Sequence, residues 1–225
     1  MEWWGVVMKH GEELIYSGAW VILIGTVISA LGLTSEATTE SPMGANLFSQ
    51  GNAIEAFGNS LQALGNTELF QEDKEQFRID SIIGCWLQFG GNSTNTVATE
   101  IEINTSEEEG YRLNAVGSGV QALGAVYEAV GAAEGISPTK NLEATGNSLI
   151  ALGAFLDAAG YVFLLKKLET LGERLALIGG WTQVLGASAE VIALTIASHI
   201  ETTHQNINVN PYSNMDYYWY ESNSY

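Results

Sequence analysis

Residues 58–66 read Gly58-Asn59-Ser60-Leu61-Gln62-Ala63-Leu64-Gly65-Asn66, and this stretch decides the fold. It holds one complete copy of a seven-residue unit, Gly-Asn-x-Leu-Gln-Ala-Leu, and the start of the next copy. Residues seven apart lie on one side of a helix, whereas a half-buried strand alternates with period two. The same period recurs along most of the chain, so the sequence predicts an all-α protein.

Glycine marks the repeat throughout. Twenty of the 25 glycines fall into six tracts with a spacing of seven: Gly11, Gly18, Gly25 and Gly32; Gly44, Gly51, Gly58 and Gly65; Gly84 and Gly91; Gly110, Gly117, Gly124 and Gly131; Gly146, Gly153 and Gly160; Gly172, Gly179 and Gly186. With glycine as heptad position a, large apolar residues fall at d and g, as Leu61 and Leu64 do. Asn at b and Gln or Glu at e form a polar stripe.

So many glycines inside helices need a compensating interaction. Each costs about 0.5–1 kcal/mol relative to alanine, so twenty cost on the order of 10–20 kcal/mol, comparable with the net stability of a domain. Close approach of helix backbones offsets such a cost in other small-residue helix pairs. We therefore predict close-packed antiparallel hairpins, with these glycines at the contacts: Gly18, Gly25, Gly51, Gly58, Gly65, Gly117, Gly124, Gly146, Gly153, Gly179 and Gly186.

The six tracts predict about six helices in one domain over residues 1–200. Ser41-Pro42 and Ser137-Pro138 are typical of helix starts, and Ser106 to Glu109 has the spacing of a capping box. We expect Gly135 to end the fourth helix and the charged residues 71–76 to separate the second and third.

Two segments are less clearly helical. The third tract is expected to end near residues 92–95, and residues 96–103 (TVATEIEI) alternate well enough to predict a short strand. Between Gly160 and Gly172 no helix breaker occurs, so one long helix is an alternative there. We favour a hairpin, because the same twelve-residue step separates Gly32 from Gly44, where Pro42 signals a turn.

The chain changes character after His199. Residues 204–211 are polar, and residues 212–225 are crowded with aromatic residues beside Asn and Ser. We predict a non-helical, extended arm over residues 201–225 that docks on a neighbouring subunit. Its aromatic side chains would make the assembly contact: Tyr212, Tyr217, Tyr218, Trp219 and Tyr220.

Charge excludes some classes of partner. Eight Lys and Arg stand against 26 Asp and Glu, for a net charge of -18. That field repels nucleic acid and disfavours electrostatic binding to anionic lipid. Cys85 is the only cysteine, so no intrachain disulfide forms. The start, Met1-Glu2-Trp3-Trp4, lacks the basic region of a Sec signal peptide, so we expect synthesis in the cytoplasm.

A membrane location is the main alternative to self-assembly. Leu14 to Leu33 is uncharged over a length that spans a bilayer, and Leu175 to Ile200 is nearly as apolar but contains Glu190. Neither segment has a flanking Lys/Arg cluster, and the other tracts carry Asn, Gln or Glu at every turn, which a bilayer penalises. The sequence therefore favours a soluble or polymeric assembly.

No catalytic, cofactor or metal motif stands out, so neither an enzyme nor a cofactor is expected. Through Gly51-Asn52, Gly58 to Asn66, Gly117 to Gly124 and Gly146 to Gly153, the chain resembles an uncharacterised family of repetitive proteins from spore-forming Firmicutes. The resemblance implies no activity, but it implies a sporulating cell or a spore-associated or extracellular structure as the location. The leading expectation is a non-catalytic structural subunit that self-assembles into a homopolymeric filament, tube or layer. An enzyme or binding module with an unrecognised site is a third class.

Overall fold

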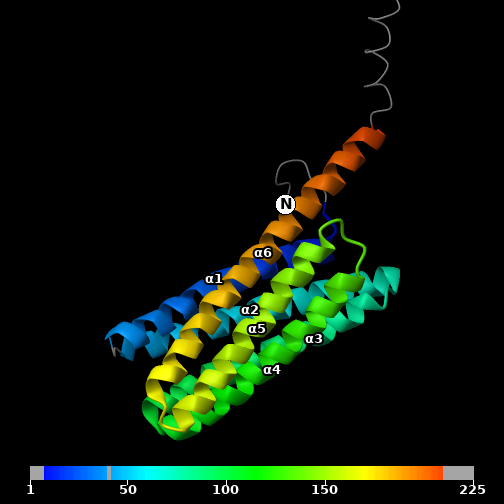
Figure 1. Ribbon diagram of the computed structural model, residues 1–225. Coiled ribbons are helices and arrows are strands. Elements are labelled where there is room, and N and C mark those ends of the chain that lie inside the picture. The colour runs from blue at the N-terminus through cyan, green and yellow to red at the C-terminus, as the bar shows by residue number, and fades with distance from the viewer. Residues whose placement is uncertain (1–7, 40–41, 210–225) are drawn as a thin grey trace, which may run out of the picture.

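The computed structural model describes the backbone of residues 8–39 and 42–209, and the side chains of residues 8–39 and 43–200. Over these ranges the protein contains helices and no strand, which confirms the all-α prediction (Figure 1). The six helices are α1 (His10–Thr39), α2 (Pro42–Asp73), α3 (Phe77–Asn104), α4 (Glu107–Glu134), α5 (Lys140–Leu165) and α6 (Glu169–Val209).

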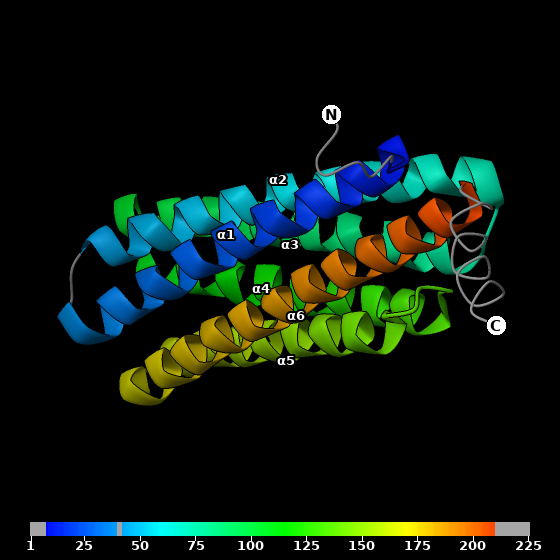
Figure 2. The ribbon, with the colours of Figure 1, turned by 90° about the horizontal axis from the view of Figure 1, so that it is seen from above.

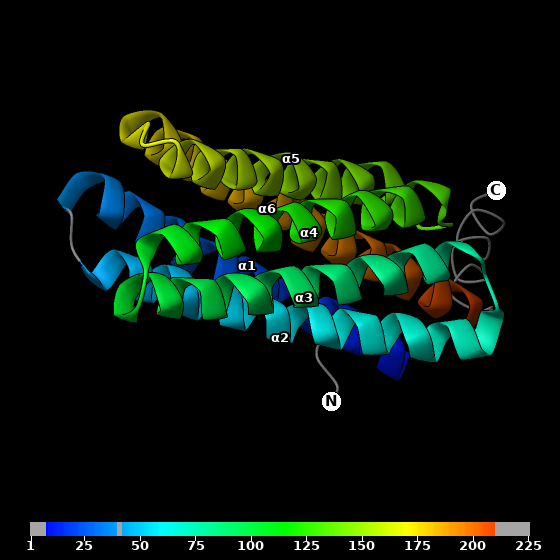
Figure 3. The ribbon, with the colours of Figure 1, turned by 90° about the horizontal axis from the view of Figure 1, so that it is seen from below.

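The helices form a closed ring. Each packs against the helices before and after it in the chain, and α6 returns to α1. Figures 2 and 3 show the bundle from opposite sides, with successive helices running in opposite directions. The α2–α3 and α4–α5 connections lie at one end, here called the two-turn end, and the α1–α2, α3–α4 and α5–α6 connections lie at the other, the three-turn end (right and left in Figure 2).

Glycines face one another across three of the helix contacts, in the hairpins α1/α2, α3/α4 and α5/α6. A Cβ atom built on Gly18 would lie 2.7 Å from the carbonyl oxygen of Gly58, and one on Gly58 would lie 2.8 Å from that of Gly18. Neither backbone has room for a side chain. The same reciprocal contact joins eight more pairs: Gly11 with Gly65, Gly25 with Gly51, Gly32 with Gly44, Gly84 with Gly124, Gly91 with Gly117, Gly146 with Gly186, Gly153 with Gly179, and Gly160 with Gly172.

Most helix boundaries lie where the sequence places them. The Ser106 side chain accepts a hydrogen bond from the backbone N–H of Glu109 (3.3 Å) and so caps α4, which ends at Gly135. The hairpin between Gly160 and Gly172 is confirmed, since α5 ends at Leu165 and α6 begins at Glu169. Helix α5 begins at Lys140, slightly later than Ser137-Pro138 indicates.

Two predictions about secondary structure are wrong. The third helix does not end near residues 92–95, and residues 96–103 are not a strand, because α3 continues to Asn104. Its buried residues Asn92, Asn95 and Thr99 recur with helical spacing, so the alternation of TVATEIEI does not reflect a sheet.

The segment after His199 is also helical for some distance, in contrast to the prediction. Helix α6 continues to Val209, so the boundary proposed at residue 200 falls inside it. Residues 210–225, with Tyr212, Tyr217, Tyr218, Trp219 and Tyr220, lie outside the described part of the chain, and the docking arm stays a prediction.

Candidate functional site: a polar axis inside an apolar bundle

The interior of the ring is polar. The largest fully buried side chains are mainly amides, including Gln62, Asn59, Asn92, Asn95 and Asn114. Four carboxyl groups are buried as well, one each from α2, α4, α5 and α6: Glu55, Glu128, Asp157 and Glu190. The polar stripe at heptad positions b and e therefore faces inward.

Hydrogen bonds join these side chains across the ring. At the middle of the bundle, the Gln121 amide on α4 donates to Glu55 on α2 (3.3 Å) and to the Gln183 oxygen on α6 (2.8 Å). The Ser29 hydroxyl on α1 donates to the other oxygen of Glu55 (2.8 Å). Helices that are not neighbours in the ring are thus connected through its centre.

The network extends toward both ends. Toward the two-turn end, Gln62 donates to Glu190 (2.6 Å) and Gln88 donates to Glu128 (2.7 Å). Toward the three-turn end, Ser118 donates to Asp157 (2.7 Å). These contacts form what we call the polar axis, because a buried carboxyl or amide without a partner is costly to hold away from water.

At the three-turn end the axis reaches a further carboxyl group, Glu102. The Asn114 amide donates to it (3.2 Å). The pKa of Glu102 is raised to about 8, mainly by burial and in addition by the nearby Glu36 and Glu107 carboxylates, while the hydrogen bond from Asn114 opposes the shift.

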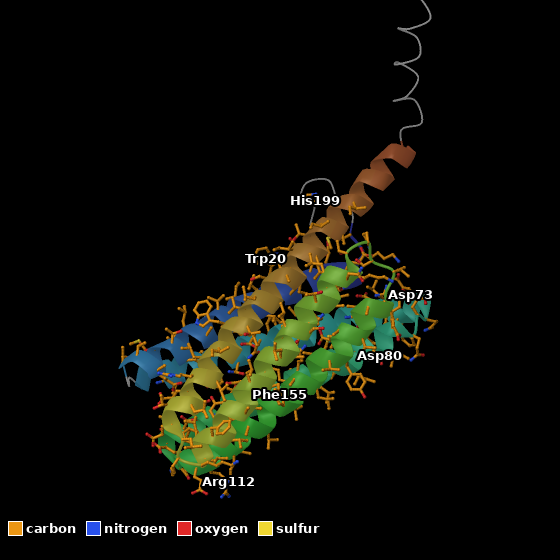
Figure 4. All side chains as sticks on the ribbon, viewed as in Figure 1. Trp20, Asp73, Asp80, Arg112, Phe155 and His199 are labelled. Atoms are coloured by element: carbon orange, nitrogen blue, oxygen red, sulfur yellow. The ribbon has the colours of Figure 1, made fainter. Side chains whose placement is uncertain are left out.

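The exterior of the ring is apolar. Exposed large side chains occur on all six helices between the two ends: Trp20, Ile24, Leu31, Phe57, Leu64, Ile83, Trp86, Phe89, Val97, Val116, Leu123, Val126, Tyr127, Val130, Leu152, Phe155, Val162, Ile178, Trp181, Leu185, Ile192 and Ile196. We call this surface the apolar belt. In Figure 4, Trp20 and Phe155 lie on the flank of the bundle, with Arg112 at one end and Asp73 and Asp80 toward the other.

Among the residues whose side chains are described, exposed charges are confined to the two ends. Each helix has a segment of 19 to 26 residues in which any Asp, Glu, Lys or Arg is one of the four buried carboxyl groups: residues 14–35, 42–67, 81–99, 113–133, 144–165 and 175–198. The exposed polar residues in these segments are uncharged, as Gln50 and Ser148 are. At the two-turn end the ionic groups pair with one another, and the hydrogen bond from the Lys9 ammonium to Glu72 (2.8 Å) raises the pKa of Lys9.

A cavity of about 430 Å³ opens at the two-turn end and extends inward to Glu128 and Glu190. Its outer part is lined by charged residues such as Lys9 and Asp73. A second, much smaller cavity of about 10 Å³ lies deeper, beside Glu55 and Asp157. Among the described residues, no cluster of three His, Cys, Asp or Glu could hold a metal ion.

The sequence prediction and the structure single out different residues. Every glycine named above as a helix-contact residue lies in one of the hairpin contacts. The sequence predicts a polar stripe that includes Gln121 and Glu190, but it predicts no functional site there. The thiol of Cys85 is buried.

A signal for the polar axis was present in the repeat. On a helical wheel, positions e and b lie on one side of the glycine and d and g on the other. Once glycine faces a partner helix, one of these flanks must turn toward the ring interior.

Comparison with known proteins gives a family but no activity. A family model described as a family of unknown function (DUF6944) matches residues 13–191, so the chain belongs to that family. No curated protein and no solved structure matches the chain.

Proposed function

We propose that this member of the DUF6944 family is a membrane-embedded six-helix bundle whose polar axis is shielded from lipid. One observation carries the proposal: between the two ends, every charged side chain is inside the ring, and large apolar side chains are exposed on all six helices. Hydrocarbon favours this arrangement, because intramembrane ionisable groups face the bundle interior and backbone polar groups are satisfied within helices.

The length of the belt supports the same conclusion. Segments of 19 to 26 residues are about 28–39 Å long at about 1.5 Å per residue, and the hydrocarbon core of a bilayer is about 30 Å thick. By length and composition alone, α1, α5 and α6 qualify as membrane spans. Helices α2, α3 and α4 are less apolar overall, but their buried amides would not meet lipid.

Three exposed tryptophans lie near the ends of the belt. Trp20 on α1 and Trp86 on α3 lie toward the two-turn end, and Trp181 on α6 lies toward the three-turn end. Tryptophan is enriched at both interfaces of a bilayer. The eight basic residues are divided equally between the ends (Lys9, Lys74, Arg78 and Lys140; Arg112, Lys166, Lys167 and Arg174), so charge favours neither orientation.

The main objection to a membrane location came from the polar repeat positions. That objection assumed that Asn, Gln and Glu would meet lipid, and their burial inside the ring removes it. Apolar exteriors can also be covered by copies of the same chain, which is the self-assembly expected from the sequence. In that case the belt would be a protein interface.

Dependence on detergent distinguishes a belt covered by lipid from a belt covered by copies of the same chain. The protein is expressed in bacteria, and membranes are washed with sodium carbonate at pH 11 and then extracted with dodecyl maltoside. We expect the protein to stay with the washed membranes and to leave them only in detergent, as a helical species by circular dichroism. Recovery of folded polymers from the detergent-free soluble fraction would overturn the proposal in favour of a homopolymer.

A further inference from the structure

The cavity at the two-turn end has an inner part rich in hydrogen-bond acceptors. The carboxyl groups of Glu128 and Glu190 line it, together with the amides of Gln62 and Asn147. Gln62 is 1% exposed and Asn147 is 3% exposed. The Gln62 Oε1 and Asn147 Oδ1 atoms have no hydrogen-bond partner, although both are buried.

An unpartnered buried oxygen is costly unless something donates to it. In the described residues, acceptors without a donor outnumber donors without an acceptor: seven of the eight buried polar atoms that have no partner are oxygens. Acidic residues also outnumber basic ones around the cavity, with five (Glu12, Asp73, Glu128, Glu143 and Glu190) against two (Lys9 and Arg78). A cavity with this lining suits a ligand that donates hydrogen bonds and carries positive charge.

The basic residues near the cavity already have partners of their own. Lys9 pairs with Glu72 (2.8 Å) and Arg78 pairs with Asp73 (2.6 Å), both at the outer end. These pairs leave the inner carboxyl groups to interact with the amides that bind them, Gln62 with Glu190 and Gln88 with Glu128.

The shape of the cavity favours an organic cation over a metal ion. Its volume, about 430 Å³, falls within the range of about 300–1,000 Å³ that is usual for small-molecule sites. Its walls include Ile15, Tyr16, Leu69, Phe77 and Leu194, which suit an apolar or aromatic body. Within the described part of the chain, no three metal-ligating side chains cluster there.

We propose that this cavity binds an organic amine, with its ammonium group among Glu128, Glu190, Gln62 Oε1 and Asn147 Oδ1 and its apolar body against the walls. A primary ammonium carries three N–H donors and no acceptor, which matches an inner end made of oxygens. Charge-assisted hydrogen bonds to the carboxylates supply most of the selectivity. The site goes beyond the proposed membrane location and does not depend on it.

The test is calorimetric titration of the full chain with 2-phenylethylamine at pH 7.5, in detergent micelles or in buffer, whichever keeps the protein monodisperse. Two probes with the same phenylethyl body serve as comparisons, the neutral 2-phenylethanol and the anionic 3-phenylpropionate. We expect the amine to bind at least about tenfold more tightly than the alcohol, and the acid to show no binding. Equal affinity for amine and alcohol, or no binding of the amine at millimolar concentration, would overturn the proposal.

Variants locate the site. Glu128→Gln and Glu190→Gln keep the shape of each side chain and remove its negative charge, so each should weaken amine binding about tenfold or more. Glu134→Gln is the matched control, because Glu134 is on the same helix as Glu128 but is exposed and outside the cavity lining. Leu194→Trp fills the cavity without touching a carboxyl group and should abolish binding. Circular dichroism checks that each variant folds, and wild-type affinity in folded Glu190→Gln and Leu194→Trp would place the amine elsewhere.

Discussion

Neighbouring glycines in this protein differ in what they contact, and that difference is decided by helical position alone. On α3, a Cβ atom on Gly91 would lie 2.6 Å from the carbonyl oxygen of Gly117 and 2.7 Å from the backbone nitrogen of Gln121. A Cβ atom on Gly90 would have no neighbour within 4 Å. Only Gly91 belongs to the repeat with period seven. The repeat glycines are thus required by backbone contact, whereas Gly90 merely lowers helix propensity.

This pair gives a matched test of close packing. Gly91→Ala should lower the free energy of unfolding by about 1–3 kcal/mol, because the methyl group forces α3 and α4 apart. Gly90→Ala should leave it unchanged or raise it by up to about 1 kcal/mol through helix propensity. Denaturant unfolding followed by circular dichroism measures both. If alanine is tolerated equally at the two positions, the hairpin contacts are looser than described.

A second residue-scale prediction concerns pH. The pKa of Glu102 is raised to about 8 from its ordinary value of 4.5, mainly by burial, so folding favours the protonated form. Its contribution to stability is full below pH 4.5 and is lost as pH rises through about 8. The melting temperature of the wild type should therefore fall between pH 5 and pH 9.

The net charge of -18 adds a general decline over the same range, so the informative quantity is the difference between variants. Glu102→Gln carries a permanently neutral side chain and should show a weaker decline than the wild type. Glu100→Gln, at an exposed position on the same helix, should follow the wild type. Thermal melts at five pH values decide between these outcomes, and parallel curves for all three proteins would contradict the assignment.

At the scale of the element, the sequence predicts where helices and turns lie better than it predicts which side of each helix faces the ring interior. Glycine periodicity predicts six helices, and Ser106 and Gly135 define the ends of α4. Hydrophobic alternation misplaces the end of α3, since residues 96–103 alternate while Asn95 and Thr99 point inward. On a helical wheel, each repeat glycine also lies between a polar flank (positions b and e) and an apolar flank (positions d and g). Which flank faces inward depends on how the hairpins close into a ring, and no local pattern contains that information.

The α5–α6 turn, where the sequence left two alternatives, has a strained residue. Lys167 has a φ of 60°, a left-handed conformation that costs a non-glycine residue about 1–2 kcal/mol. Lys167→Gly should stabilise the protein by up to about 1 kcal/mol, after the entropy that glycine adds to the unfolded chain. Lys166→Gly is the control, because its φ of −85° suits any residue, and it should destabilise slightly. Denaturant midpoints that shift equally for both variants would show that the turn is not strained.

For the whole molecule, the distribution of side chains is the reverse of that in a soluble bundle. Carboxyl and amide groups occupy the centre, where Gln121 joins α2, α4 and α6, and large apolar residues occupy the flank. A water-soluble monomer rarely exposes so many large apolar side chains around its flank. Close glycine contacts complete the arrangement, since they hold neighbouring helices together through backbone packing.

The last prediction tests whether lipid covers the belt. Trp20, Trp86 and Trp181 are exposed on the flank, about two helical turns from the nearest charged residues. Three variants are made, each of which keeps one of these tryptophans and carries Phe at the other five tryptophan positions of the chain. Each variant is reconstituted into vesicles of lipids brominated on their acyl chains. Bromine quenches tryptophan only on contact, so all three should lose most of their fluorescence. Shallow bromines should quench more than deep ones, because each tryptophan lies toward an end of the belt rather than its middle.

As a control, Glu108→Trp in a background without other tryptophans is placed beyond the belt and should be little quenched. Fluorescence of the three belt tryptophans that is as insensitive to bromine as the control would show that protein, not lipid, covers this surface.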